Sequence, residues 1–524
     1  MSSRLNLWQR VGCALIALAV AMAGVPVRAQ VRLPSLGESA SDDLTVAAEK
    51  RVGDQIMREI RRDPDYLDDP VLLDYLQSIW NPLVSAARQR GDLSADIGAA
   101  FAWEAFLVRD RSVNAFALPG GYVGVHLALI ALTGSGDELA SVLAHELSHV
   151  TQRHIARSVT NSQRQGLLAL AGLILGVLAA GRSHSPDAAQ AAVIGSQAAS
   201  VQGQLNFSRD MEREADRIGF AVLDQAGFEA AGMALMFEKL DQANRLNDSG
   251  SYPYLRSHPL TTERIAEARV RAGTTVPGAL TRLEHQLMQS RSRVLMDPSV
   301  QTRRRLQELD LEGKASTPSE RVAALYASAM ASMVLRDFAR AEQALASSQR
   351  MVLAMGTGVE PRAARALALF GVELALAQGE TQMAARRLAA FAQDSTSRPY
   401  LLLQAQVAVA GNDTELLKRQ TEALQAWVTE HRGDVLAWEA LSQCADRLGL
   451  KLRAVRAQAE AHAAQGDLNG AIERLRAGQR LARSGNAQDF IESSVIDARL
   501  RDLEAQRRQL VAELRGNRPA RDPE

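Results

Sequence analysis

The sequence predicts a mainly α-helical protein with a small antiparallel β-sheet in its first half and an α-solenoid in its second half. Of the 524 residues, 47% are hydrophobic but only 4% are aromatic, and this composition favours helices over β-sandwiches and barrels. The chain is also too long for one ordinary core. We therefore divide it into a signal peptide (1–29), a first folded domain (30–300), a linker (301–318), a helical repeat domain (319–515) and a tail (516–524).

Net charge and cysteine content exclude several kinds of protein. Basic and acidic residues are equal in number, at 60 each, so the chain lacks the basic footprint of a nucleic-acid-binding protein. Only Cys444 remains once Cys13 leaves with the signal peptide. We therefore expect neither an internal disulfide nor a cysteine-based zinc site.

The N-terminal residues have the pattern of a secretory signal peptide. Arg4 and Arg10 precede an apolar run at 11–23, and small residues before Ala29 offer a cleavage site. The mature chain would then start at Gln30. An uncleaved membrane anchor is the alternative, but the run is short for a bilayer span.

Two helices and three strands are expected at the start of the first domain. Residues 44–61 and 71–89 have apolar residues at helical spacing. Short alternating segments at 105–108, 115–118 and 122–125 predict strands, and a Pro-Gly-Gly turn joins the last two. These strands form the small antiparallel sheet beside the helices.

Three further helices and one apolar run complete this domain. A Gly-Ser-Gly-Asp turn caps a helix predicted at 138–157, and helices are also expected at 208–227 and 261–271. Residues 167–180 form an uninterrupted apolar run that is too short to cross a bilayer unaided. We interpret it as part of a buried helical hairpin. The alternative is a flap that contacts a membrane peripherally or touches an unfolded client.

From about residue 319 the sequence changes to Ala-rich helices separated by short Gly/Asp turns. Imperfectly repeated segments resemble the turns between the helices of tetratricopeptide repeats. In such repeats small residues, here Ala341, Ala384 and Ala471, allow the paired helices to pack closely. The spacing is irregular, so a degenerate array is predicted, with a generic helical bundle as the alternative. The charged residues 501–524 are expected to end as a frayed tail.

The candidate chemistry begins with the pattern His-Glu-x-x-His on the helix predicted at 138–157. His145 and His149 are four residues apart and share one helix face, so both imidazoles can reach the same ion. Glu146 can approach a water beside the metal without binding the metal itself. Two idle histidines on an amphipathic helix are the alternative, but idle polar groups among apolar neighbours would be costly. The pattern is typical of zinc-dependent peptide hydrolysis.

A zinc site needs a third protein ligand, and its position decides the subclass. The extended metzincin pattern would require glycine and histidine at positions now occupied by Gln152 and Ile155. His154 falls off the face shared by His145 and His149, and we interpret it as a surface residue.

Glu212 and Asp216 are better candidates, because they lie four residues apart on the helix predicted at 208–227. Two carboxylates at that spacing repel each other on a bare helix. A cation would resolve the conflict if Glu212 binds it and Asp216 hydrogen-bonds a ligand imidazole or a reacting group. The alternative is a solvated charged face paired with neighbouring arginines.

These motifs together resemble the M48 peptidase family. The pattern H-E-x-x-H is followed at long range by E-x-x-A-D, and the segment Asn-Ala-Phe-Ala-Leu-Pro-Gly-Gly at 114–121 is similar to one that such enzymes carry before the zinc helix. With a signal peptide ahead and repeats behind, the chain resembles a periplasmic group of that family that enhances β-barrel assembly. The resemblance implies a gluzincin-type metallopeptidase domain that holds one Zn²⁺ per chain.

The resemblance also implies roles for individual residues. His145, His149 and Glu212 would be zinc ligands, Glu146 the catalytic base, and Asp216 a proton donor or an orienting residue. His258 matches a histidine that can close over the zinc of the resting enzyme, and a fourth protein ligand there would displace the catalytic water. The alternative for His258 is a plain surface or capping residue.

Three functions remain open on the sequence alone. The first is an exported zinc metalloendopeptidase that degrades misfolded or stalled envelope proteins. Its strand at 115–118 would hold an extended substrate at the sheet edge, and its repeats would bind clients or the outer-membrane β-barrel assembly machinery. The second is a repeat scaffold or chaperone with a largely silent zinc site. The third is a structural envelope protein without metal, which leaves the H-E-x-x-H pattern and the carboxylates of Glu212 and Asp216 unexplained. An ordinary internal strand is the alternative for 115–118.

Overall fold

The computed structural model describes residues 45–158, 208–246, 252–273, 282–311, 313, 315–391, 396–411, 413–482 and 490–516. The predicted signal peptide, the apolar run at 167–180 and residues 517–524 lie outside these ranges. Within them, no helix is both long enough and apolar enough to cross a membrane.

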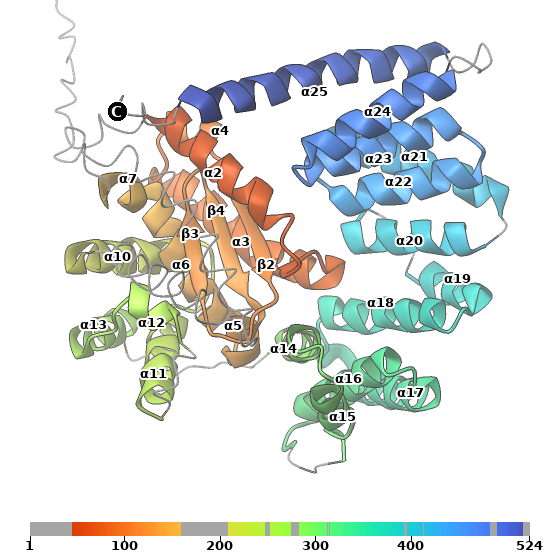
Figure 1. Ribbon diagram of the computed structural model, residues 1–524. Helices are drawn as coiled ribbons and strands as arrows, with labels where there is room; N and C mark the ends of the chain where they lie inside the picture. The colour runs from red at the N-terminus through yellow and green to blue at the C-terminus, as the bar shows by residue number, and fades with distance from the viewer. Residues whose placement is uncertain are drawn as a thin grey trace, which may run out of the picture. The chain divides into compact units, whose positions relative to one another are not determined.

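The first half of the described chain is a helical domain with one small sheet, as predicted (Figure 1). Its elements are α2 (Val46–Ile60), β1 (Tyr66–Leu67), α3 (Pro70–Arg90), α4 (Ala95–Ala100), β2 (Glu104–Val108), β3 (Ala115–Leu118), β4 (Tyr122–His126), α5 (Leu127–Leu132), α6 (Gly136–Thr151), α7 (His154–Ser158), α10 (Arg209–Gln225), α11 (Ala231–Leu246), α12 (Tyr254–Ser257), α13 (Thr262–Ala272) and α14 (Leu283–Met296).

The four strands form one mixed sheet in the order β1-β2-β4-β3. β3 and β4 are antiparallel across their Pro-Gly-Gly turn, and β1 is antiparallel to β2. β2 and β4 are parallel, with Glu104 opposite Tyr122, so the prediction of a wholly antiparallel sheet was wrong. Local alternation identifies strands but does not give their order, and here the hairpin inserts its second strand beside β2. This order leaves β3 at one edge of the sheet, in contact with α6.

The helix predicted at 138–157 is broken into α6 and α7. Arg153 has a left-handed backbone, with φ of 52°, which ends one helix and starts the next in a new direction. Its guanidinium Nε lies 3.0 Å from Oε2 of the buried Glu49 on α2, and this ion pair holds the turn. The residues after the turn therefore do not follow the face on which a continuous helix would place them.

The second half of the described chain is helical throughout. Its elements are α15 (Val300–Gln307), α16 (Pro318–Val334), α17 (Phe338–Met355), the 3₁₀ turn η3 (Gly356–Gly358), α18 (Pro361–Ala377), α19 (Thr381–Ala389), α20 (Arg398–Ala410), α21 (Thr414–Glu430), α22 (Val435–Arg447), α23 (Lys451–Ala464), α24 (Leu468–Ala482) and α25 (Phe490–Gly516). Figure 1 shows consecutive helices from α16 to α24 packed in pairs, which is consistent with the predicted solenoid.

Small residues lie at the close contacts between paired helices. Ala341, Ala384 and Ala471 are fully buried near the starts of α17, α19 and α24, where a larger side chain would push the helices apart. The predicted linker 301–318 contains most of α15. The helix α25 continues to Gly516, so the charged residues 501–516 are helical. Residues 517–524, where the chain was expected to end as a frayed tail, lie outside the described residues.

The core is continuous across the predicted domain division. One cluster of buried apolar side chains includes Leu67, Leu143, Leu287, Tyr326 and Val407. The N-terminal end of α3 is also tied to later helices by ion pairs, of which Arg291 with Asp69 is buried and Arg398 with Asp68 is half-buried. The division into separate domains stays a prediction.

Candidate metal centre

The helix α6 presents the two histidines of the H-E-x-x-H pattern to one point. Ser135 caps the helix, because its side chain accepts a hydrogen bond from the Glu138 backbone N–H at 3.2 Å. From there His145 and His149 follow on one face, and their Nε2 atoms lie 3.0 Å apart. Both side chains are almost completely buried.

The helix α10 brings Glu212 and Asp216 against the same face of α6. Ser208 caps α10, and Glu212 lies in its first turn, where the helix dipole favours a carboxylate. Close packing of the two helices depends on Gly219, since a Cβ there would lie 3.1 Å from the backbone of Ala144 and His145. Both carboxylates are buried, which excludes the solvated charged face considered from the sequence.

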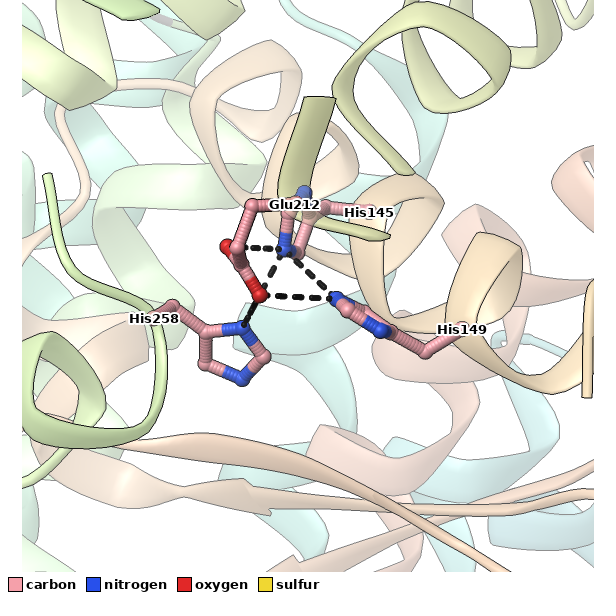
Figure 2. A group of neighbouring side chains, drawn as sticks. All are labelled: His145, His149, Glu212 and His258. Carbon is pink, nitrogen blue, oxygen red and sulfur yellow. Dashed lines mark hydrogen bonds and ion pairs between the residues drawn. The ribbon is translucent and has the colours of Figure 1, made fainter. Parts of the chain in front are cut away.

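His258 reaches the cluster from the end of α12. Its side chain is only 2% exposed and stacks on Tyr254 at a ring distance of 4.7 Å. Nδ1 lies 3.0 Å from Glu212 Oε1 and 3.3 Å from His145 Nε2. His258 is therefore the C-cap residue of α12, but it is not a surface residue. Its ring faces the other three candidate ligands (Figure 2).

The four residues fit a tetrahedral zinc ion. One donor atom from each of His145, His149, Glu212 and His258 lies within 4.8 Å of every other. A tetrahedral ion with bonds of about 2.0–2.1 Å needs donor atoms about 3.3 Å apart. The separations are 3.0 Å and 3.3 Å from His145 to the other two histidines, and 3.0 Å and 3.4 Å from Glu212 to His258 and His149. Three imidazoles and one carboxylate are also ligands that zinc prefers.

Asp216 and Arg264 support this cluster from behind. Asp216 Oδ1 lies 2.9 Å from His145 Nδ1, which is one of the two contacts expected for it from the sequence. Arg264 on α13 donates from Nε and from one terminal nitrogen to the Asp216 carboxylate at 2.7 Å and 2.8 Å. Its other terminal nitrogen lies 2.8 Å from Glu212 Oε2 and donates to the Pro259 carbonyl at 2.9 Å.

Arg264 was not predicted from the sequence. It lies beside Ile265 and four residues before Ala268, on the buried face of α13. A cationic side chain on the apolar face of an amphipathic helix is unusual. This position in the sequence could have indicated that Arg264 pairs with a buried carboxylate.

Glu146 lies beside the four candidate ligands and is fully buried. Its Oε2 accepts a hydrogen bond from the Ala117 backbone N–H at 3.0 Å. Its Oε1 has no hydrogen-bond partner among the described residues, and it faces His258 Nε2 at 3.5 Å. Burial raises the pKa of this carboxyl group, which suits a group that accepts a proton near neutral pH.

The prediction that His154 is a surface residue was wrong. Its side chain is completely buried, and Nδ1 lies 2.9 Å from Nδ1 of His149. The left-handed turn at Arg153 explains this burial, because it redirects the chain so that α7 packs against α6. Glu214 on α10, which the sequence analysis did not select, lies 3.0 Å from the other nitrogen of His154.

The electrostatics of the cluster favour positive charge at His145 but not at His149. Burial opposes a charged imidazole at His145, but Asp216 and Glu212 outweigh it and raise the pKa to about 10. Burial likewise opposes ionisation of Glu212, yet His258 and His145 hold its pKa far below the usual range. The pKa of His149 is lowered, because the ring is buried and faces three other histidines.

The sheet edge beside α6 is the last part of the site. Within the described residues β3 pairs with β4 alone. The His126 N–H donates to the Asn114 carbonyl at 3.1 Å, and hydrogen-bonded and free positions alternate along an antiparallel ladder. Ala115 and Ala117 therefore direct their backbone groups away from β4, and the Ala117 N–H donates to Glu146. Among the described residues β3 is thus an edge strand and not an internal one.

Comparison with known proteins agrees with this geometry. Residues 75–272 match the model of peptidase family M48. The chain is 32% identical to the beta-barrel assembly-enhancing protease of Escherichia coli, over 90% of this chain and 92% of that protein. It is 39% identical to the putative beta-barrel assembly-enhancing protease of Vibrio cholerae, over 53% of this chain and 56% of that protein.

A more distant relative belongs to another cellular setting. The mitochondrial metalloendopeptidase OMA1 of Saccharomyces cerevisiae is 27% identical over 36% of this chain and 53% of its own length. From the family match and the full-length similarity, the chain belongs to peptidase family M48 and is a metalloendopeptidase.

Proposed function

We propose that this protein is an exported zinc metalloendopeptidase that degrades misfolded or stalled envelope proteins. The observation that carries the proposal is the buried cluster of His145, His149, Glu212 and His258, with Glu146 beside it and a free strand edge next to Glu146. A fully buried cluster of this kind is costly unless it binds a cation.

Each residue has a separate task in the proposed reaction. Zinc, when bound by His145, His149 and Glu212, supplies the Lewis acidity that polarises a peptide carbonyl. Glu146 takes a proton from the water that attacks this carbonyl. The accepting atom is Oε1, the carboxylate oxygen without a hydrogen-bond partner among the described residues. The Ala117 N–H holds the other oxygen and fixes the direction of the carboxylate. Asp216 keeps the His145 ring oriented, and Arg264 keeps Asp216 in place.

The edge of β3 is the proposed substrate-binding element. An extended peptide can add to the edge as a further strand, using the outward-facing backbone groups of Ala115 and the carbonyl of Ala117, whose N–H already donates to Glu146. Glu146 is hydrogen-bonded to this same edge, so a peptide bound there passes directly beside the base. Backbone hydrogen bonds do not depend on side chains, and broad specificity for unfolded chains follows.

The cellular setting rests on the N-terminal pattern and on the relatives. Residues 1–29 have the composition of a signal peptide with cleavage after Ala29, which supports a periplasmic location for the mature chain. The relatives from E. coli and V. cholerae carry names that refer to β-barrel assembly. We propose accordingly that the repeats at 319–515 bind client proteins or the outer-membrane β-barrel assembly machinery.

The test is the zinc content and casein cleavage of the purified mature chain. We expect about one zinc per chain. Glu146→Gln should keep the zinc and lower cleavage by about 10²–10⁴-fold. The control Glu263→Gln removes an exposed carboxylate from α13 that pairs with Arg213 and should cleave like the parent. A parent chain that binds no zinc would overturn the metal assignment.

A second candidate function is a repeat scaffold or chaperone whose peptidase site is largely latent. The position of His258 favours it, because the ring lies at the fourth vertex of the cluster and also faces Glu146. His258→Ala distinguishes the two functions. A gain in casein cleavage would show that His258 restrains an active peptidase, whereas zinc without cleavage in parent and variant would favour the scaffold.

A further inference from the structure

A chain of three side chains runs outward from His149, on the side away from the other candidate ligands. His149 Nε2 faces His145 and Glu212, at 3.0 Å and 3.4 Å. On the opposite side of the ring, His149 Nδ1 lies 2.9 Å from His154 Nδ1. The other nitrogen of His154 lies 3.0 Å from Glu214 Oε2.

The direction of each hydrogen bond in this chain follows from chemistry. A neutral imidazole that binds zinc through Nε2 carries its proton on Nδ1. His149 Nδ1 therefore donates, and His154 Nδ1 accepts. A neutral His154 then carries its own proton on Nε2, where the Glu214 carboxylate accepts it. The carboxylate at the outer end thus selects the tautomer of both rings.

The surroundings hold this chain in one arrangement. The left-handed turn at Arg153, fixed by the ion pair with Glu49, swings His154 under His149. At the outer end Arg157 donates to the same Glu214 oxygen at 2.9 Å. His154 is fully buried, while the Glu214 side chain is 27% exposed. The inner part of the chain is buried, and its outer end is partly exposed to solvent.

We propose that His154 and Glu214 are positioning residues that fix the tautomer and ring orientation of His149 for zinc. This proposal rests on the proposed function, since it takes His149 as a ligand. Ligand histidines usually donate their second N–H to a carboxylate, a backbone carbonyl or a water. His145 follows that rule through Asp216, whereas His149 reaches its carboxylate through a second histidine. Loss of such a partner typically weakens metal affinity about 10–100-fold.

The zinc dissociation constant of the mature chain, measured by competition with a chromophoric chelator, tests the proposal. Glu214→Ala removes the outer carboxylate at a partly exposed position, so it is expected to fold. We expect zinc to bind about 10–100-fold more weakly to this variant. The control Asp210→Asn removes a carboxylate from the same helix, and that side chain is 92% exposed. It should bind zinc like the parent.

Two substitutions of His154 separate positioning from packing. His154→Phe fills the space but offers no acceptor to His149 Nδ1, and it should lose affinity as Glu214→Ala does. His154→Asn offers a side-chain oxygen near the position of Nδ1 and should recover most of the affinity. The visible spectrum of the Co²⁺-substituted protein should change in the first variant and return towards the parent in the second, which packing alone would not produce.

The outcomes distinguish this proposal from the proposed function. Zinc affinities of Glu214→Ala and His154→Phe within twofold of a zinc-binding parent would overturn the positioning role alone. A parent that binds no zinc would overturn the positioning role and the metal assignment together. Weakened binding in both variants, with recovery in His154→Asn, supports the chain of hydrogen bonds derived above.

Discussion

Replacement of Arg264 is the most informative perturbation of this site. Arg264 is 5% exposed and contacts two buried carboxylates, Asp216 through two nitrogens and Glu212 through a third. Removal of one partner from a buried ion pair costs about 3–5 kcal/mol, because the remaining charge is left in a low-dielectric region. We expect Arg264→Gln to lower the free energy of unfolding of the metal-free protein by at least about 3 kcal/mol.

The same helix provides a matched control. Arg269 on α13 pairs with Glu238 at 2.6 Å, but both side chains are exposed, at 62% and 40%. Solvent screens such a pair, and its loss typically costs about 0–1 kcal/mol. Arg269→Gln makes the same chemical change on the same helix, but it leaves no buried carboxylate without its partner.

The assay is urea unfolding followed by circular dichroism, with a metal chelator in excess. The quantity compared is the free energy of unfolding of each variant relative to the parent. Zinc should then reduce the penalty of Arg264→Gln, because a divalent cation neutralises Glu212 directly. Free energies for Arg264→Gln and Arg269→Gln that agree within about 1 kcal/mol would refute the reasoning.

Two further predictions concern packing and pH. Gly219→Val would place a Cβ 3.1 Å from the α6 backbone and should lower the free energy of unfolding by about 1–3 kcal/mol. The control in the same urea assay is Gly98→Val, where a Cβ meets nothing within 4 Å. Equal losses of stability in the two variants would contradict the argument that α6 and α10 approach closely at Gly219. Arg398 and Trp427 overcome the effect of burial and lower the pKa of Asp434 below its unfolded value, which is about 3.9. The ion pair with Arg398 therefore contributes fully above that pH and is lost as pH falls through the folded pKa. The stability difference between parent and Asp434→Asn should be large at pH 7 and shrink below about pH 4, and a constant difference down to pH 3 would be inconsistent with this assignment.

Local patterns predicted the elements of the fold well, because helices and strands obey short-range rules. Ser135 and Ser208 cap the helices that carry the candidate ligands, and the three strands lie within one residue of their predicted ends. The order of the strands could not be predicted in the same way. Whether β4 pairs with β2 in parallel depends on long-range packing, and alternation along each strand is the same for either order.

The candidate site was predictable to the same extent and for the same reason. His145 and His149 share a face through simple helix geometry, and Glu212 and Asp216 were chosen because like charges at that spacing need a cation. His154 was misinterpreted because a continuous helix was assumed, and one left-handed residue redirects the chain. Glu214 and His149 lie on different helices, as do Arg264 and Asp216, so no local pattern connects the two members of either pair.

The charges gathered around the cluster explain why a divalent cation suits it. Among the described residues, three buried carboxylates meet there, from Glu146, Glu212 and Asp216, and Arg264 contacts two of them. One guanidinium leaves two negative charges in a region where unpaired charge is very costly. The raised pKa of His145 is the local expression of this imbalance. A dication bound by Glu212 and the histidines restores neutrality, whereas a monovalent ion or a single protonated imidazole corrects only half of it.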